Sequence, residues 1–407
     1  MDEKDRLLLT YLQNGLPLIP RPFDVLAAKS RADNADLLVR IQRLKKEGTF
    51  GGIKAILEPR AFHYQSAWVA MRLGEKHQVS PEDVPKEQQS VRLGEKHQVF
   101  PEDVPNEQQS ARRGESSDAR LEVLWQHPGV IYGCEREHEF NLWFFIAVPA
   151  GYDLEVHVRC LAKLSGAQRF LFLPVCKVFK GNDLLSSLDA EIFPAMSECF
   201  EKRQTVGSSN LMERLGRECR TPAETVLKDW FLAEEVEMIR QLQEPFPLTD
   251  EPYRKIAVDL GITEAQALER IKSLIQKGCL KRIGSFSKPS GVVSAAKTLV
   301  VWQIPEEKLE RIGPEIAKMA EVLCADGRPA FSEFPYSLYT MVRAGTSEEI
   351  EALVRRIQEH IGKWPHRVLV TTRELKKKKM NYFPKELDAW WHENRHAVET
   401  AFHENSM

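Results

Sequence analysis

Hydrophobic and polar positions follow the same pattern twice along this 407-residue chain. Residues 1–71 and 231–301 match at a constant offset of 230. The matches include Leu12, Pro17, Leu18, Pro22 and Phe23, which recur as Leu242, Pro247, Leu248, Pro252 and Tyr253. Such a repeat indicates a duplicated unit or a fusion of two related subunits, so we expect a functional site at the seam between the halves.

Each half opens with a predicted helix-turn-helix domain. In the first half, residues 7–12 form a short apolar helix, Pro22 restarts the chain, and an apolar stripe at helical spacing continues to Gly48. In the second half, Thr263 with Gln266 three residues later is a capping-box signature. We therefore predict two similar helical domains, at 1–56 and 231–284.

Runs typical of strands follow each helical domain. They lie at 67–71, 140–148 and 169–179 in the first half and at 299–304, 338–342 and 367–373 in the second, with helices at 153–164 and 347–360. This order suggests a ferredoxin-like βαββαβ domain in each half, closed by the last strand run of that half. The predicted class is α+β by tandem duplication, with ferredoxin-like domains at 57–180 and 285–385 and a C-terminal helix or tail at 386–407.

A repeat with a period of 20 residues interrupts the first half, with copies that start at Arg72, Arg92 and Arg112. The offset between matching residues falls from 230, for Arg40 and Arg270, to 192, for Arg136 and Arg328. Most of the segment is therefore an insertion that the second half does not have. Because it is rich in Glu, Gln, Lys and Pro, we predict an exposed, partly disordered insertion at about 73–115. Residues 181–230 are expected to form a linker.

Composition favours a protein with more than one core, since 43% of residues are hydrophobic and 29% are charged. A formal net charge of −2 gives no general positive field for nucleic acid or anionic lipid, and the basic run at 376–379 is local. No apolar stretch approaches the roughly 20 residues of a membrane helix, and the N-terminus lacks signal-peptide character. We expect a cytoplasmic protein. Its seven scattered cysteines favour reduced thiols.

Residues 392–396 spell His-Glu-Asn-Arg-His, which matches the zinc-protease pattern H-E-x-x-H. No glutamate-bearing helix follows as a third ligand, so we expect a solvated C-terminal helix and no metal site. Loops of the Walker, G-x-S-x-G and G-x-G-x-x-G types are absent from the sequence, which leaves phosphate cradling and serine acyl chemistry without support.

The most informative segment is 132–144, Tyr-Gly-Cys-Glu-Arg-Glu-His-Glu-Phe-Asn-Leu-Trp-Phe. It places an arginine, a histidine, an asparagine and a tryptophan on a tight hairpin, where several can face one side. A cation, an imidazole, an amide and a broad aromatic face suit a flat, polycarboxylated ligand. The alternative is a hairpin whose Arg136 and His138 pair with Glu135, Glu137 and Glu139.

The pattern Arg-x-His-x-Phe-Asn-Leu-Trp-Phe after a helix-turn-helix resembles the siroheme decarboxylases of the alternative heme pathway and of heme synthesis for nitrite reductase. The second half, with Arg328 to Met341, Lys281 to Gly284 and Thr372 to Lys376, resembles the partner subunit of that enzyme. The likeness covers nearly the whole chain outside the insertion and linker. This family shares its fold with the Lrp/AsnC transcription regulators, so each ferredoxin-like domain is expected to be of the Lrp/AsnC effector type, and the helix-turn-helix does not require DNA.

The resemblance implies non-oxidative decarboxylation of the C12 and C18 acetate side chains of siroheme to didecarboxysiroheme and carbon dioxide. His138 would donate the proton or contact the iron, and Arg136 and Arg328 would hold acetate or propionate groups. Catalytic roles thus fall to His138 and Arg136. The expected substrate-binding residues are Tyr132, Asn141, Trp143, Arg328, Tyr336, Tyr339, Arg373 and Lys376. We expect no cofactor beyond siroheme, whose iron belongs to the substrate, no protein-bound metal and no membrane; a homodimer is left open.

The chain departs from the family pattern H-x-Y-x-R. Tyr132 and Cys134 stand in the two positions before Arg136, and Cys324 and Asp326 in those before Arg328. Gly51-Gly52 also stand where the second half has Lys281-Arg282. Two alternatives therefore stay open. One is a tetrapyrrole-binding protein without turnover. The other is an Lrp/AsnC-type DNA-binding regulator, although its recognition helices, 33–47 and 264–277, are charge-mixed without a basic excess.

Overall fold

The computed structural model of the chain describes residues 2–31, 33–48, 50–74, 119–180, 231–285, 297–344 and 346–403. The predicted linker and nearly all of the predicted insertion lie outside these residues. None of the described helices has the length and hydrophobicity needed to cross a bilayer.

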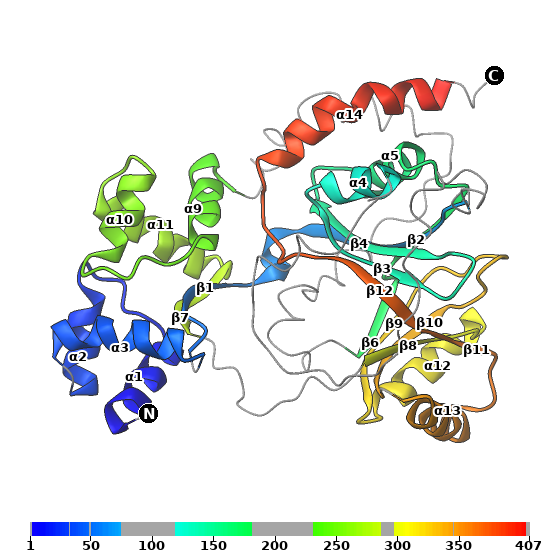
Figure 1. The fold of residues 1–407 in the computed structure, drawn as a ribbon, viewed down its shortest axis with the longest axis horizontal. Coiled ribbons are helices and arrows are strands. Elements are labelled where there is room, and N and C mark those ends of the chain that lie inside the picture. Colours follow the sequence, from blue (N-terminus) through cyan, green and yellow to red (C-terminus); the bar gives the residue numbers. More distant parts are fainter. Residues whose placement is uncertain are drawn as a thin grey trace, which may run out of the picture.

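The two predicted helix-turn-helix domains are confirmed and lie together at one end of the molecule (Figure 1). Their helices are α1 (Glu3–Asn14), α2 (Pro22–Ser30) and α3 (Asn34–Lys46), and then α9 (Ala233–Gln243), α10 (Pro252–Asp259) and α11 (Glu264–Gln276). Proline occupies the first position of α2 and of α10, where its missing N–H costs nothing. The predicted capping box at Thr263 is present, since its backbone N–H donates to Gln266 Oε1 at 3.0 Å.

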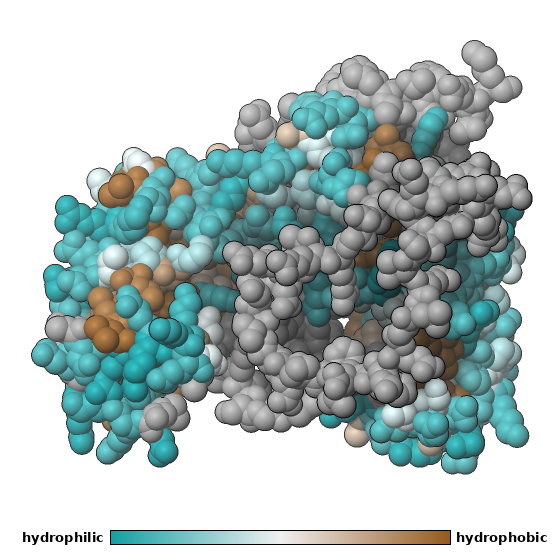
Figure 2. Space-filling view, viewed as in Figure 1, coloured by the Kyte–Doolittle hydropathy of each residue, from teal (hydrophilic) through white to brown (hydrophobic). Residues whose placement is uncertain are grey.

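A two-stranded antiparallel ribbon joins these domains, formed by β1 (Ile53–Leu57) and β7 (Leu280–Ser285). The apolar stripes of both domains pack into one core with the ribbon, which includes Leu12, Leu37, Ile41, Tyr253, Ile271 and Ile283. Figure 2 shows apolar surface gathered over the same end of the molecule.

The rest of the chain is a four-layer α/β/β/α sandwich, preceded by a 3-10 turn at Pro59–Phe62. The first sheet has the order β12-β3-β4-β2-β5 and the second has the order β11-β8-β10-β9-β6, and all neighbouring strands are antiparallel. In the first half the strands are β2 (Tyr64–Arg72), β3 (Val130–Arg136), β4 (Leu142–Pro149), β5 (Arg169–Pro174) and β6 (Lys177–Lys180). In the second they are β8 (Lys297–Trp302), β9 (Val322–Gly327), β10 (Leu338–Arg343), β11 (His366–Leu369) and β12 (Thr371–Lys377).

Helices cover the outer face of each sheet. On the first sheet lie α4 (Ala119–Gln126), α5 (Leu154–Leu164) and α14 (Glu386–His403), and on the second lie α12 (Glu306–Ala317) and α13 (Ser347–Ile361). The predicted C-terminal helix is α14, but it is not simply solvated. Its first turns pack on the first sheet through Leu387, Trp390 and Trp391. These large apolar side chains are only 2%, 6% and 2% exposed. His392 and Glu393 are exposed.

The prediction that the strand runs 169–179 and 367–373 each close their own half was wrong. Each run divides into two strands, and the second strand crosses to the other sheet, so that β6 pairs with β9 and β12 pairs with β3. The exposed edges of β3 and β9 need a partner for their backbone groups, and a strand of either half can supply it. Strand patterns in the sequence do not say which edge a strand will join.

Candidate active site

The inner faces of the two sheets meet in an aromatic layer, at the seam between the halves. Phe334, from the loop before β10, lies at its centre, with ring centroids 5.8 Å from Trp143 and 4.8 Å from Tyr336. The layer also contains Trp68, Tyr132, Phe140, Leu173, Tyr339 and Leu369. The structure thus brings together four residues that the sequence predicted, namely Tyr132, Trp143, Tyr336 and Tyr339.

Arg136 is buried at one end of β3 and is 6% exposed. Its Nη1 donates to the carbonyl oxygen of Leu369 at 2.6 Å, and its guanidinium carbon lies 5.4 Å from the ring centroid of Trp143. Its Nε is buried without a hydrogen-bond partner. Among the described residues no carboxylate pairs with it. A buried cation without a counter-ion is costly, so this position suits a bound anion.

The hairpin glutamates do not neutralise Arg136, contrary to the alternative considered above. Glu135 pairs with Arg373 at 2.8 Å, and Glu139 lies 3.7 Å from Arg72. Glu135 and Arg136 are consecutive on a strand and therefore face opposite sides of the sheet.

Arg328 repeats the arrangement of Arg136 in the second half. It is 7% exposed, its Nη1 donates to the carbonyl oxygen of Leu173 at 2.6 Å, and its guanidinium carbon lies 5.4 Å from the ring centroid of Tyr339. Its Nε is also buried without a hydrogen-bond partner. The difference is Asp326, whose Oδ2 accepts from Nη2 of Arg328 at 3.1 Å.

Asp326 is a site residue that the sequence did not identify. It stands two residues before Arg328 and opposite Tyr339, as Cys134 stands two before Arg136 and opposite Trp143. Burial raises the pKa of Asp326, although Arg328 acts to lower it. Burial likewise raises the pKa of the Cys134 thiol and of the Tyr339 hydroxyl, whose oxygen is buried without a hydrogen-bond partner. The sequence signal that could have identified Asp326 is its position two residues before Arg328, which matches that of Cys134 before Arg136.

His138 lies in the turn between β3 and β4, at the rim of the aromatic layer. Its ring packs edge-on against Phe334 at a centroid distance of 5.3 Å. Burial lowers its pKa, with a smaller contribution from the charge of Arg367. The backbone N–H of Phe140 donates to Nδ1 at 3.0 Å. Because Nδ1 accepts this bond, the neutral imidazole carries its proton on Nε2.

Three predicted substrate-binding residues do not reach the aromatic layer. Asn141 is exposed, and its Oδ1 accepts from the backbone N–H of Leu73 at 3.1 Å. On β12, Arg373 pairs with Glu135, and Nζ of Lys376 donates to the carbonyl oxygen of Trp125 at 2.6 Å. Both β12 cations thus lie toward the outer side of the first sheet. Burial lowers the pKa of Lys376 to about 8.

Comparisons with known proteins fit this architecture. The model of an AsnC-like ligand binding domain matches residues 294–376, and that of the siroheme decarboxylase NirDL-like HTH domain matches residues 5–50 and 235–280. A siroheme decarboxylase of Hydrogenobacter thermophilus is 28% identical, over 95% of this chain and 97% of its own length. The siroheme decarboxylase beta subunit of Methanosarcina barkeri is 31% identical, over 35% of this chain and 94% of its own length.

The crystal structure of the siroheme decarboxylase NirDL in complex with an iron-uroporphyrin III analogue has the same fold. It aligns with a TM-score of 0.62 at 24% identity and covers 97% of this chain and 99% of that one. Fold and site together define a class of tandem chains, in which two helix-turn-helix domains precede two AsnC-like domains that enclose an arginine-bearing aromatic layer. The chain belongs to the siroheme decarboxylase family, as a single chain that covers both subunit-like halves.

Proposed function

We propose that this siroheme decarboxylase, a carboxy-lyase, removes the carboxylates of the C12 and C18 acetate side chains of siroheme and yields didecarboxysiroheme and carbon dioxide. The observation that carries the assignment of the site is Arg136, a buried guanidinium without a carboxylate partner among the described residues, set against Trp143. A flat macrocycle with several carboxylates offers both an aromatic face and an anion. The related NirDL structure contains such a macrocycle, an iron-uroporphyrin III analogue.

The reaction breaks one carbon–carbon bond at each acetate. The electron pair stays on the methylene carbon, delocalised into the macrocycle, and a proton then converts this carbon to a methyl group while carbon dioxide leaves. Binding that is equally strong before and during bond cleavage does not accelerate the step. We therefore assign Arg136 and Arg328 to the carboxylates that remain on the macrocycle, which they hold in position, and not to the carboxylates that leave.

Two groups at the layer supply the protons that this scheme needs. His138 donates from Nε2 as the imidazolium, a form in which Nδ1 is protonated and the bond from the N–H of Phe140 is lost. Contact of Nε2 with the iron is the alternative role of His138. In the second half Asp326 retains its proton to higher pH than an ordinary aspartate does, because it is buried. Each half thus holds one donor for one of the two acetates, and Tyr132, Trp143, Tyr336 and Tyr339 supply aromatic faces for the macrocycle.

The test is anaerobic incubation of the full chain with siroheme, with product mass followed over time. The chain should give successive losses of one and then two carbon dioxide molecules. His138→Gln and Asp326→Asn should each stall after a single loss, and at different side chains of the macrocycle. Arg373→Gln is the matched control and should complete both losses, because Arg373 lies on the outer side of the sheet. If both donor variants also complete both losses, the assignment of the donors is wrong.

Binding without turnover is the second candidate, and the unmatched family positions at Tyr132, Cys134, Cys324 and Asp326 favour it. Siroheme that stays bound to the wild-type chain without any mass loss would select this function.

DNA binding is disfavoured by ion pairs of α3. Its Arg40 and Arg43 contact the buried carboxylate of Asp5 at 3.0 and 2.7 Å, and Arg40 also pairs with Asp36. In α11, Arg270 pairs with Glu234 at 3.1 Å. Phosphate contacts require cations that are available to the backbone of DNA. A salt-sensitive gel shift would contradict this conclusion.

A further inference from the structure

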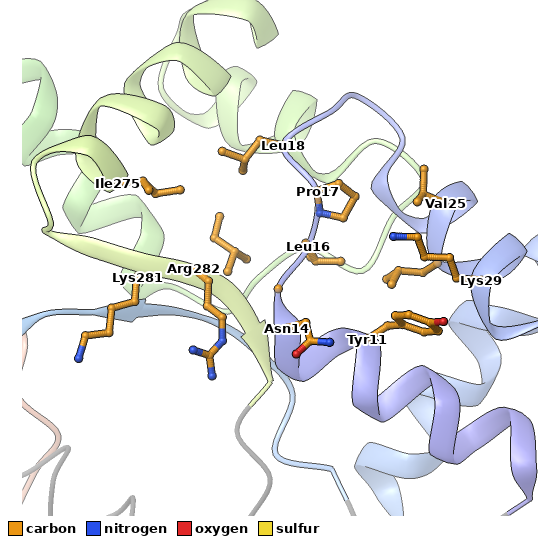
Figure 3. Close-up of a pocket in the computed structure, with 13 residues that line it drawn as sticks. Tyr11, Asn14, Leu16, Pro17, Leu18, Val25, Lys29, Ile275, Lys281 and Arg282 are labelled. Atoms are coloured by element: carbon orange, nitrogen blue, oxygen red, sulfur yellow. The ribbon is translucent and has the colours of Figure 1, made fainter. Parts of the chain in front are cut away.

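A cavity of about 310 Å³ lies between the two helix-turn-helix domains (Figure 3). Tyr11 and Asn14 of α1, Lys29 of α2 and the loop between these helices form one wall. The C-terminal end of α11 and residues Lys281, Arg282 and Ile283 of β7 form the other. The cavity therefore belongs to both halves of the chain and lies outside the sandwich that holds the aromatic layer.

The charged groups of this cavity are only partly neutralised. Lys281 pairs with Glu58 at 2.6 Å. Nε of Arg282 is buried without a hydrogen-bond partner, and neither Arg282 nor Lys29 forms an ion pair with any described residue. The ammonium of Lys29 instead lies 5.7 Å from the ring centroid of Tyr11. Lys29 and Arg282, which form no ion pair with a described residue, thus lie on opposite walls of a cavity that Leu16, Val25 and Ile283 make apolar.

The duplication provides an internal comparison, because equivalent residues are 230 positions apart. The equivalents of Lys281 and Arg282 are Gly51 and Gly52, and the equivalent of Lys29 is Asp259. The equivalent of Leu16 is Phe246, whose larger ring packs 5.9 Å from Tyr253. The cationic lining is thus a property of one side only and does not follow from the repeated fold.

Arg282 is held in place by backbone geometry. Gly15 has φ of +106°, a conformation that favours glycine, and a Cβ at this position would lie 3.2 Å from Cβ of Arg282. The loop is fixed to the same strand, because the N–H of Leu16 donates to the carbonyl oxygen of Ile283 at 2.7 Å. The backbone and Cβ of Arg282 are therefore held in place by the fold itself.

We propose that this cavity is a binding site for a small organic carboxylate with a compact apolar body. Arg282 binds the carboxylate through charge-assisted contacts to its guanidinium group. The apolar body packs against Leu16 and Ile283. The site is separate from the aromatic layer, and a ligand there joins α1 and α2 of the first half to β7 of the second.

The experiment uses isothermal titration of the full chain with benzoate, hexanoate and inorganic phosphate, each to about 10 mM, a range that detects millimolar affinity. Benzoate or hexanoate should bind, and phosphate should bind at least about tenfold more weakly because it has no apolar body. Arg282→Gln should weaken carboxylate binding about tenfold or more through loss of the charge-assisted contacts. Arg254→Gln, an exposed cation of α10, is the matched control and should bind as the wild type does.

Leu16→Phe tests the cavity without altering charge, because phenylalanine is the residue that the second half carries at the equivalent position. It should abolish carboxylate binding while the circular dichroism spectrum and the decarboxylase activity stay unchanged. The proposal is overturned if neither carboxylate binds the wild-type chain, if Arg282→Gln binds as tightly as the wild type, or if phosphate binds as tightly as benzoate. Because the wild-type chain is assayed for siroheme turnover separately, failure here leaves the proposed function intact.

Discussion

The two buried arginines of the aromatic layer form a matched pair, and their replacement should change stability in different ways. Arg136→Met should leave the free energy of unfolding unchanged or raise it, whereas Arg328→Met should lower it. Methionine keeps most of the buried volume and removes the charge. The two arginines make equivalent bonds to a carbonyl oxygen and equivalent contacts with an aromatic ring, and they differ in the partner Asp326.

The magnitudes follow from these contacts. Each replacement removes a charge-assisted hydrogen bond to a buried carbonyl oxygen, that of Leu369 or Leu173, at a cost of about 1–3 kcal/mol. Removal of Arg136 also relieves the desolvation penalty of an unpaired cation, which is still several kcal/mol after relaxation. The net change for Arg136→Met is therefore between about 0 and 2 kcal/mol of stabilisation. Arg328→Met leaves Asp326 buried without its partner, and broken buried pairs cost about 3–5 kcal/mol.

Urea unfolding at pH 7, followed by far-ultraviolet circular dichroism and tryptophan fluorescence, measures both values. The double variant Arg328→Met with Asp326→Asn is the control and should recover most of the loss, because no buried carboxylate remains. Both arginine variants should lose turnover of siroheme. Equal destabilisation by Arg136→Met and Arg328→Met would refute the inference that Arg136 lacks a counter-ion.

The pH dependence of Arg328→Met gives a further check on the same pair. Arg328 lowers the pKa of Asp326, so its removal should let burial raise that pKa further. An acid whose pKa is higher in the folded than in the unfolded state stabilises the fold below its unfolded pKa and loses this contribution as the pH rises. The deficit of Arg328→Met relative to the wild type should therefore shrink as the pH falls toward the ordinary pKa of aspartate, 3.8.

Three other perturbations probe the outer layers. Burial lowers the pKa of His157 from 6.5 to about 3, so protonation of this residue destabilises the fold as the pH falls from 6.5 toward 3. In His157→Gln the free energy of unfolding should therefore fall less over this pH range than in the wild type. His392→Gln, at an exposed position, should behave as the wild type does. In Gly313→Ala the new Cβ would lie 2.4 Å from ring atoms of Phe179, so urea unfolding should show a loss of about 1–3 kcal/mol as β6 is displaced. Lys376→Met should keep full siroheme turnover, and an inactive variant would return Lys376 to the substrate site.

The sequence was sufficient for the elements with strong local signals, although helices α4 and α12 and strands β1, β7 and β9 were not among the predicted runs. The apolar stripe of α11 and its capping box at Thr263 repeat within one or two helical turns, and both are present. The repeat offset identified Arg136 and Arg328 as equivalent residues, and the structure places them in equivalent contacts. The sequence could therefore predict which element a residue belongs to and which residues of the two halves are equivalent.

The direction of the β12 side chains was not predictable, because it depends on register. Arg373 and Lys376 are three residues apart and would face opposite sides of a regular strand. Two register shifts against β3, between Thr371 and Arg373 and between Glu374 and Lys376, bring both cations to the same outer side. A shift of one residue reverses the side that a strand residue faces, and bulges of this kind leave no clear trace in residue type.

Strand exchange explains why the site needs both halves of the chain. Arg136 of the first half donates to Leu369 on β11 of the second, and β11 leads directly into the exchanged strand β12. Arg328 of the second half donates to Leu173 on β5 of the first, and β5 leads directly into the exchanged strand β6. Each arginine is thus anchored on the other half, immediately before the chain crosses between sheets. A half on its own would lack both its fifth strand and the acceptor of its arginine. Relatives that match nearly the whole chain and relatives that match only about a third of it are both known.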